Sequence, residues 1–344
     1  MPNLRINQFL FVVACTGASL IGLVGQAQRG LDKNDMPQSA TRFASAAPHL
    51  WFHPPGPISR EKAFHQLDPD FDRLFDAKTT WQQSAARVEV FKFYASHILG
   101  SSDVDLKRQV AWLRRHNMAV AVEAGILTID PTTKCGGGVE GYGYSIEPLM
   151  KRLKDIDADL EFITMDEPLF FGHEFAGRRA CRSSISALAR QVAENVGRIR
   201  SYYPLVKFID VEPVANFKSA DLVSEVADWL KTYQANTNEP MFALFMDVAW
   251  WVDGGQRSAL RLTQLLRSAR VPVGVIYDGP TSEISSGQAW IDEAKSYWRQ
   301  YESLARSTPD YAVFQSWAPQ PKRYLPETSP DAFTNLLLDY INNH

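Results

Sequence analysis

The segments LEFITMDEP, at residues 160–168, and VKFIDVEP, at residues 206–213, decide the fold class of this chain. Each is a short run of β-forming residues that ends in a glutamate followed by proline. Between them, Ser183 to Tyr202 has the apolar spacing of an amphipathic helix. Strand, helix and strand in this order form a βαβ unit, in which the two strands run parallel. These residues therefore predict parallel α/β architecture.

The same alternation continues on both sides of this unit. Eight candidate strands can be read: His49 to His53, Val88 to Tyr94, Met118 to Ala124, Leu160 to Asp166, Val206 to Val211, Phe242 to Val248, Pro272 to Tyr277, and Tyr311 to Gln315. Amphipathic helices are predicted over Asp103 to His116, Ser183 to Tyr202, Ala220 to Gln234, Gln256 to Arg270, Gln288 to Ala305 and Pro330 to Asn343. A doubly wound open sheet has the same alternation, but eight units favour closure, and no GxGxxG or GxxxxGKS/T motif opens a helix. We predict a single α/β domain over 46–344, a (β/α)8 TIM barrel.

The first 27 residues have the pattern of an export signal. Arg5 supplies a positive charge, Phe9 to Val24 is almost continuously apolar or small, and Gly25-Gln26-Ala27 offers a cleavage site. We predict a signal peptide over 1–27, a flexible segment over 28–45, and a secreted or periplasmic protein with no stable membrane insertion after signal removal. Two alternatives stay open. Val12-Val13-Ala14-Cys15 resembles a lipobox, which would make Cys15 a lipid anchor, and the apolar run could stay uncleaved as a membrane anchor.

Composition narrows the class of partner. Hydrophobic residues make up 45% of the 344 residues and charged residues 22%, which is typical of a globular protein. The formal net charge of -3 gives no attraction toward a polyanion, and no Lys/Arg cluster is interleaved with aromatic residues. We therefore do not expect this protein to bind nucleic acid.

Two cysteines, Cys135 and Cys181, remain after signal removal. Exported proteins fold in compartments that permit disulfides, and both residues fall in predicted loops after strands three and four, which are neighbours in a barrel. We predict a disulfide between them; two unpaired thiols are the alternative.

Carboxylates stand at the ends of five consecutive predicted strands. In a barrel, the carboxyl ends of the strands form the face on which active sites are built. Side chains alternate along a strand, so residues of one parity share a face. If the acidic parities face inward, several carboxylates meet in one cavity; the alternative is that they cap helices or face solvent. The residues concerned are Glu123, Asp166, Glu167, Asp210, Glu212, Asp247 and Asp278.

Asp166-Glu167-Pro168 resembles the Asn-Glu-Pro at the end of strand four in the large clan of barrel glycoside hydrolases. The resemblance implies that Glu167 is the general acid/base and that Asp278, at the end of strand seven, is the nucleophilic carboxylate. Phe314-Gln315-Ser316-Trp317 resembles strand eight of that clan, whose tryptophan often floors the sugar site. Asp166 stands where the clan has asparagine, and Asp278 where it usually has glutamate. The resemblance spans the order of the barrel elements, although its motifs are short.

The chemistry of the residues supports the same hypothesis. Glycoside cleavage needs one protonated carboxyl and one ionised carboxylate, and clustered like charges push carboxyl pKa values apart. We expect Glu167 to be the acid and Asp278 or Glu212 its partner. We expect substrate contacts from the remaining strand-end carboxylates and from aromatic residues that could instead be core residues: Glu123, Asp166, Asp210, Asp247, Tyr94, Trp250, Trp251, Tyr277 and Trp317. Polar helpers could be His53, Lys92, His97 and His173, although a histidine near a strand end is more often structural.

Other chemistries lack their motifs. No HExxH is present and no His-x-His follows strand one, so neither a metal ligand set nor a cofactor is predicted. A calcium or magnesium site made of oxygens stays open. No Gly-x-Ser-x-Gly is present, which disfavours an esterase. We predict an exported glycoside hydrolase acting on an oligo- or polysaccharide; the alternatives are a noncatalytic carbohydrate-binding barrel and a carboxylate-metal hydrolase such as a phosphodiesterase.

Overall fold

The structure, a computed structural model, describes residues 47–56, 70–143, 145–217, 221–281, 286–318 and 320–344. By its internal contacts the chain divides into Met1–Ala44 and Ser45–His344, and every described residue belongs to the second unit. The predicted signal peptide, the predicted flexible segment over 28–45 and Cys15 lie outside the described residues.

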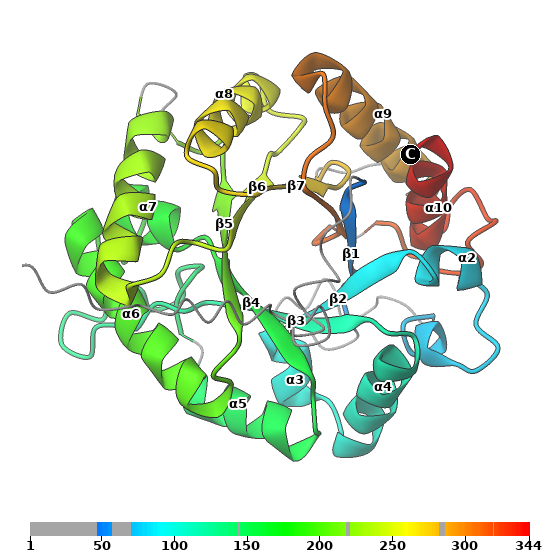
Figure 1. Cartoon of the computed structure of the whole chain (residues 1–344), viewed down its shortest axis with the longest axis horizontal. Coiled ribbons are helices and arrows are strands. Elements are labelled where there is room, and N and C mark those ends of the chain that lie inside the picture. The colour runs from blue at the N-terminus through cyan, green and yellow to red at the C-terminus, as the bar shows by residue number, and fades with distance from the viewer. Residues whose placement is uncertain (1–46, 57–69, 144, 218–220, 282–285, 319) are drawn as a thin grey trace, which may run out of the picture. The chain divides into compact units, whose positions relative to one another are not determined.

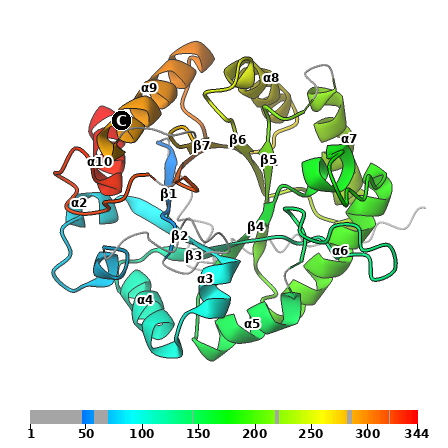
Figure 2. The ribbon, with the colours of Figure 1, turned by 180° about the vertical axis from the view of Figure 1, so that it is seen from behind.

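Eight parallel strands close into a barrel, in which β1 pairs with both β2 and β8 (Figures 1 and 2). The predicted (β/α)8 TIM barrel is therefore confirmed. Four predicted strands have the observed bounds, and the other four differ by one or two residues at an end. The strands are β1 (His49–His53), β2 (Val88–Tyr94), β3 (Ala119–Ala124), β4 (Leu160–Asp166), β5 (Lys207–Pro213), β6 (Ala243–Asp247), β7 (Val273–Tyr277) and β8 (Tyr311–Gln315).

Helices alternate with the strands and form an outer ring around them (Figure 1). They are α2 (Gln82–Ala85), α3 (Ala95–Gly100), α4 (Asp103–Arg115), α5 (Ile146–Asp155), α6 (Ile185–Tyr202), α7 (Leu222–Thr237), α8 (Gly255–Ser268), α9 (Gly287–Ala305) and α10 (Phe333–Asn343), with the short helices η2 (Asp72–Phe75) and η3 (Phe170–Glu174). Ser184 caps α6 by accepting a hydrogen bond from the N–H of Ala187. The last helix begins at Phe333 rather than at Pro330, because the chain first makes a turn in which the Ala332 N–H donates to Ser329.

Alternate residues of each strand fill two separate cores. Inside the barrel, the Trp51 ring lies 4.9 Å from Phe162, 5.0 Å from Phe245 and 6.1 Å from Tyr311, measured between centroids. Gly274 leaves room for this layer, since a Cβ there would lie 2.0 Å from the Phe245 ring. This plug of aromatic rings fills the barrel below its carboxyl end and fixes which strand parity points inward.

The opposite parity packs against the helices. Phe52, next to Trp51 on β1, contacts the rings of Trp81 and Phe333 at 5.4 and 5.0 Å. Tyr277 of β7 contacts Tyr301 of α9 and Tyr340 of α10. Both faces of every strand are therefore buried, as expected for a sheet covered by helices.

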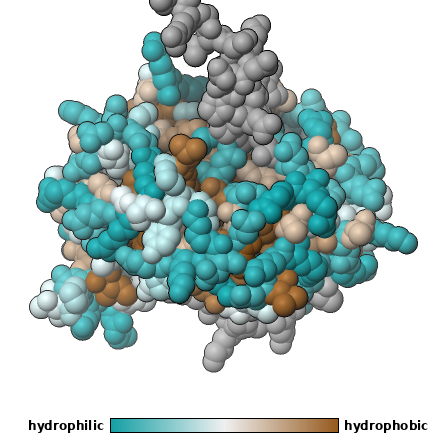
Figure 3. Space-filling view, turned by 60° about the horizontal axis from the view of Figure 1, so that its bottom comes forward, coloured by the Kyte–Doolittle hydropathy of each residue, from teal (hydrophilic) through white to brown (hydrophobic). Residues whose placement is uncertain are grey.

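The side of the molecule shown in Figure 3 is mostly hydrophilic, with hydrophobic residues scattered among polar ones. Among the described residues, the exposed large hydrophobic side chains are Leu99, Val104, Leu205, Val252, Leu304 and Trp317. Of these, Trp317 lies just after the carboxyl end of β8, and Val252 lies in the loop between β6 and α8. The described helices include none with the length and apolar content needed to cross a membrane.

Candidate active site

On β3, β6 and β7, the predicted acidic residues lie at the carboxyl end of the barrel, on the side of each strand that faces the barrel interior. Glu123 accepts a hydrogen bond from the ammonium of Lys92 on β2, and Lys92 also donates to Oε1 of Gln315 on β8 at 2.8 Å. Asp247 and Asp278 share the parity of Phe245 and Gly274, which face the interior layer. All five side chains are buried. These strands therefore bring Glu123, Asp247 and Asp278 toward one mouth, as the parity argument predicts.

The inward orientation predicted for β5 is wrong. Asp210 accepts a hydrogen bond of 2.7 Å from the indole Nε1 of Trp229 on α7, so its side chain faces the helix layer. Glu212 accepts hydrogen bonds from the backbone N–H groups of Leu169 and Phe170, at 2.7 and 2.9 Å. Its carboxylate satisfies donors at the start of the segment after β4, which is a capping role. Neither residue lies on the inward face of β5.

Glu167 begins the β4–α6 segment in a left-handed backbone conformation, with φ of 49°. A non-glycine residue in this region is uncommon and is found where the surroundings impose it. Gly141 lies against this turn, because a Cβ on Gly141 would come within 2.8 Å of the Asp166 carbonyl oxygen. The loop between β3 and α5 is thus pressed onto the end of β4, and the Glu167 side chain is only 8% exposed.

Burial and mutual repulsion raise the pKa of each of these carboxyls. Burial raises the pKa of Glu167 well above its usual value, and the charges of Glu140 and Asp247 raise it further. Burial and Glu123 raise the pKa of Asp247 to about 6. Burial, followed by the charge of Asp247, raises the pKa of Asp278 well above its usual value, and the nearby indoles of Trp317 and Trp250 oppose the shift. Each of these groups therefore holds its proton more readily than an isolated carboxyl does, and their mutual repulsion favours a state in which some are protonated while others are ionised.

Asp166 stands beside this group but is only half-buried. Burial raises its pKa, as do the charges of Glu123 and Glu140, whereas Lys92 and a backbone hydrogen bond from Gly141 act in the opposite direction. Asp166 therefore belongs electrostatically to the acidic mouth.

His53 and Tyr94 complete one side of the mouth. The two rings lie 3.9 Å apart, and the Tyr94 hydroxyl donates to the Ser316 carbonyl at 3.2 Å. Neither ring nitrogen of His53 has a hydrogen-bond partner of normal geometry among the described residues, and the residue is 0% exposed. Burial lowers the His53 pKa, and the charge of Lys92 lowers it further. A side-chain interaction with Gln315 acts in the opposite direction but is the smallest of the three effects, so the neutral imidazole is favoured.

The predicted aromatic residues divide into core and mouth residues. Tyr277 points outward and donates to Glu302 of α9 at 2.8 Å, so it does not line the mouth as expected. Trp250 is buried, stacked between Tyr277 and Tyr297. Trp251 and Trp317 are partly exposed, and their rings lie 6.1 Å apart. This pair is the exposed aromatic surface next to Asp278.

The predicted disulfide is present: Cys135 and Cys181 are bonded, with their Cα atoms 5.0 Å apart. It joins the β3–α5 loop to the β4–α6 segment. The same two segments are joined by a hydrogen bond of 2.8 Å from the Gly136 N–H to the Arg179 carbonyl and by one of 2.9 Å from the Arg179 guanidinium to Gly137. The segments that carry Glu140 and Glu167 are therefore linked to each other.

Gln315 and Glu140 belong to the site but were not among the predicted residues. Gln315 could have been found, because it shares the parity of Tyr311 and Val313 at the end of β8. Glu140 has no comparable signal, since it lies in a loop whose path the sequence does not specify.

Metal ligands are found at a different place. Within the described part of the chain, the only group with ligand atoms of three suitable side chains within 4.8 Å of one another is His173, Glu174 and Glu225. His173 Nδ1 lies 2.6 Å from the Ser183 carbonyl, which can only accept, so Nδ1 carries the hydrogen. These three residues, between η3 and the first turn of α7, could hold a divalent ion.

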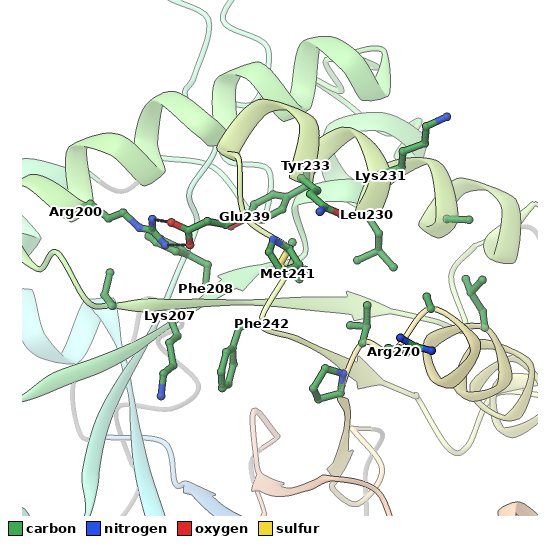
Figure 4. A pocket seen from close by; sticks show the side chains of 18 of the residues that line it. Arg200, Lys207, Phe208, Leu230, Lys231, Tyr233, Glu239, Met241, Phe242 and Arg270 are labelled. Carbon is green, nitrogen blue, oxygen red and sulfur yellow. Dashed lines mark hydrogen bonds and ion pairs between the residues drawn. The ribbon is translucent and has the colours of Figure 1, made fainter. Parts of the chain in front are cut away.

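A cavity of about 710 Å³ lies at the other end of the barrel, at the amino ends of β5, β6 and β7. Figure 4 shows its apolar floor, which includes Met241 and Phe242, and the Arg200–Glu239 ion pair at one side. Barrel active sites form at the opposite end. This cavity therefore does not overlap the acidic mouth.

The sequence matches no family model and no curated protein. Solved structures are similar at low identity. An intracellular xylanase from Thermoanaerobacterium saccharolyticum, in complex with xylotriose, is 13% identical over 84% of this chain and 93% of its own, with a TM-score of 0.45. A family 10 glycoside hydrolase from Paenibacillus barcinonensis is 10% identical over 89% and 98%, with a TM-score of 0.44. A fungal β-1,4-galactanase is 10% identical over 84% and 100%, with a TM-score of 0.49. Scores of this size do not bear on the activity.

Proposed function

We propose that this chain is an exported barrel glycoside hydrolase that cleaves a glycosidic bond of an oligo- or polysaccharide. The observation that carries the proposal is the set of buried carboxyls with raised pKa at the carboxyl end of the barrel, centred on Glu167. Perturbed carboxyl groups that converge at this end of a barrel are typical of catalytic acids and bases.

Glu167 acts as the general acid. A carboxyl that is still protonated near neutral pH can donate its proton to the leaving glycosidic oxygen. Burial and the charges of Glu140 and Asp247 raise the Glu167 pKa and so favour its protonated form. The arrangement supplies a proton at a position where an exposed glutamate would already have lost it.

Asp278 acts on the anomeric carbon, either as the nucleophile or through a water. It is 1% exposed, and neither of its oxygens has a hydrogen-bond partner of normal geometry among the described residues. Buried carboxylates with structural roles have such partners, as Glu212 does. The carboxylate of Glu212 is already held by backbone donors. Of the two candidates, Asp278 is therefore the partner of Glu167 in this proposal.

Trp251 and Trp317 offer flat apolar faces for a sugar ring, and the neutral His53 offers a hydrogen bond to a hydroxyl. Asp247 acts on both proposed catalytic carboxyls through its charge, which raises the pKa of Glu167 and of Asp278. Asp166 and Glu123 contact the substrate or position the groups that do.

The test compares Glu167→Gln, Asp278→Asn and the control Glu194→Gln, which changes an exposed residue of α6. We expect both mouth variants to lose polysaccharide cleavage by about 10²- to 10⁴-fold, as is usual when an acid or base is removed, and the control to keep it. Glu167→Gln should retain cleavage of dinitrophenyl glycosides, because their leaving group needs no protonation.

Three outcomes would contradict the proposal. If wild type and Glu167→Gln release sugar equally, the acid is another group. If the wild type binds saccharides but cleaves none, the chain is a binding barrel. If phosphodiesters are cleaved instead and a chelator abolishes this, the carboxylates serve a metal.

A further inference from the structure

A histidine and two glutamates that do not belong to the acidic mouth meet between η3 and α7. His173 and Glu174 are the last residues of η3, and Glu225 lies in the first turn of α7. One ligand atom of each residue lies within 4.8 Å of those of the other two. Because two atoms bound to one tetrahedral Zn²⁺ ion lie about 3.4 Å apart, side-chain movements of about 1 Å bring all three within reach of one ion.

The imidazole of His173 is held in the orientation that a metal ligand needs. Its Nδ1–H donates to the Ser183 carbonyl at 2.6 Å, so in the neutral ring Nε2 carries the lone pair. Nε2 lies 3.9 Å from Oε1 of Glu174. A charge-assisted hydrogen bond would draw these two atoms to about 2.7–2.9 Å, whereas 3.9 Å lies in the range for two ligands of one ion. Metal-binding histidines are usually fixed by such a bond from their other ring nitrogen.

Glu225 supplies a carboxylate oxygen that receives no hydrogen bond of normal geometry from the described residues. This atom, Oε2, is buried. Glu174, which interacts with Glu225, is a second carboxyl and repels it when both are ionised. Two ionised carboxylates in contact need a proton or a cation between them. The imidazole nitrogen beside them favours a metal ion, because such an ion binds nitrogen and oxygen ligands together.

The donor atoms indicate the class of ion. Ca²⁺ and Mg²⁺ are bound by oxygen ligands, so neither explains a histidine in the set. An imidazole nitrogen combined with carboxylate oxygens is typical of Zn²⁺. The three side chains are partly exposed, so an ion can enter from the solvent and water can complete its coordination.

We propose that His173, Glu174 and Glu225 bind one Zn²⁺ ion, through Nε2 of the histidine and one oxygen of each glutamate. The ion would join η3 to α7. The N–H of Phe171 in η3 donates to the Glu167 carbonyl at 3.1 Å, so the ion would also fix the segment that begins with Glu167 to a helix of the outer ring. This site does not depend on the proposed function.

The test measures metal binding to the full chain by titration calorimetry, after treatment with a chelator and removal of the chelator. At neutral pH we expect one Zn²⁺ ion per chain, bound at least about 100-fold tighter than Ca²⁺ or Mg²⁺. Zn²⁺ at a concentration about 100 times its Kd should raise Tm by roughly 4–8 °C, because it binds the folded state and not the unfolded one.

Two variants locate the site. His173→Gln and Glu225→Gln should each weaken Zn²⁺ binding by about 100-fold or more and remove the rise in Tm, because each deletes a ligand. Their Tm without Zn²⁺ should lie within about 2 °C of the wild-type value, which shows that they fold. His116→Gln is the matched control and should bind Zn²⁺ as the wild type does. His116 also has Nδ1 bonded to a backbone carbonyl, that of Trp112 at 2.8 Å, but it belongs to no such set among the described residues.

Four outcomes would overturn the inference. They are a Zn²⁺ Kd weaker than about 1 mM, Zn²⁺ binding that survives both substitutions, an equal loss in His116→Gln, and tighter binding of Ca²⁺ than of Zn²⁺. Glu167→Gln should keep the Zn²⁺ affinity of the wild type. If Zn²⁺ binds as expected but the wild type cleaves no polysaccharide, the inference stands and the proposed function fails. Glu167-dependent cleavage by a chain that binds no Zn²⁺ is the reverse result.

Discussion

Replacing Lys92 by methionine tests whether this lysine compensates buried negative charge. Lys92 is 0% exposed and Glu123 is 6% exposed, and the two are bonded inside the barrel. Methionine has a similar length and no charge, so the variant keeps most of the packing. Glu123 would then be buried without a cation, and Gln315 would lose the donor that lies 2.8 Å from its Oε1.

The expected loss of stability follows from these contacts. Removing one partner of a buried ion pair costs about 3–5 kcal/mol, and the lost hydrogen bond to Gln315 adds about 1 kcal/mol. Because Lys92 also lowers the pKa of Asp166 and Asp247, its removal makes their ionised forms less stable as well. In a domain of this size, about 5 kcal/mol corresponds to a fall of roughly 10–20 °C in Tm.

Urea unfolding at neutral and acidic pH measures the effect. Lys92 lowers the pKa of Asp166 and Asp247, so its removal raises the folded-state pKa of both groups. Stability is then lost as pH rises from the unfolded value of about 3.9 through these raised folded values, so the variant should recover part of its loss on acidification. The double variant Lys92→Met/Glu123→Met should be more stable than Lys92→Met, with a coupling energy of about 3 kcal/mol.

A loss below about 1 kcal/mol in Lys92→Met, with no recovery at low pH, would refute this reasoning. It would mean that Lys92 does not compensate buried negative charge in the folded protein.

Three further predictions follow from the site. Asp247→Asn should stabilise the protein at neutral pH by up to about 3 kcal/mol, because the Asp247 pKa of about 6 lies about two units above its usual value. The gain should shrink as the pH falls below about 6 and vanish below about 3.9, the unfolded pKa of aspartate, and an equal gain in urea unfolding at neutral pH and at about pH 3 would contradict the assigned pKa. Replacing Cys135 and Cys181, 46 positions apart, by serine should cost up to about 4 kcal/mol by releasing the unfolded chain, as measured by unfolding of both forms without reductant. An unchanged midpoint would contradict that prediction. Trp317→Ala, at a side chain 37% exposed, should weaken oligosaccharide binding about tenfold but change stability by about 0.5 kcal/mol or less, whereas Trp250→Ala should cost about 3–5 kcal/mol. Calorimetry and thermal melts distinguish the two, and a structural role for Trp317 would reverse the pattern.

The fold could be predicted because its signal repeats. Each of the eight units carries the same order of strand, turn and helix, so an error of one or two residues in one unit does not affect the rest. The end of β5 shows where this precision stops: the sequence predicts that the strand ends at Val211, whereas Pro213 is its last residue. A proline at the end of a strand removes only one hydrogen bond of the ladder, so the strand can extend as far as Pro213.

The site could be predicted only in part, because both faces of each strand are buried. On β5 the inward parity includes Ile209 and Val211, and the outward parity includes Phe208, so hydrophobicity does not tell the two apart. Parity alone shows that Asp210 and Glu212 share a face without showing which one. The deciding contact is with Trp229, which comes from a helix whose position the sequence does not give.

Asp278 differs from the outward-facing carboxylates of β5 in its hydrogen bonds, and this difference supports the proposed function. On the outer face, Glu212 receives two backbone hydrogen bonds and Asp210 one from an indole. On the inner face, Asp278 receives none of normal geometry from the described residues, although it is 1% exposed. A fold selected only for stability would either give such a group its donors or replace it by an apolar residue, since an unsatisfied buried carboxyl is among the costliest features a core can contain. In the proposed function, the groups that satisfy Asp278 belong to the bound saccharide, which would explain why this cost is tolerated. Asp278→Asn should for this reason stabilise the empty protein and weaken its complex, and a variant in which both fell together would place Asp278 with Glu212 among the structural carboxylates.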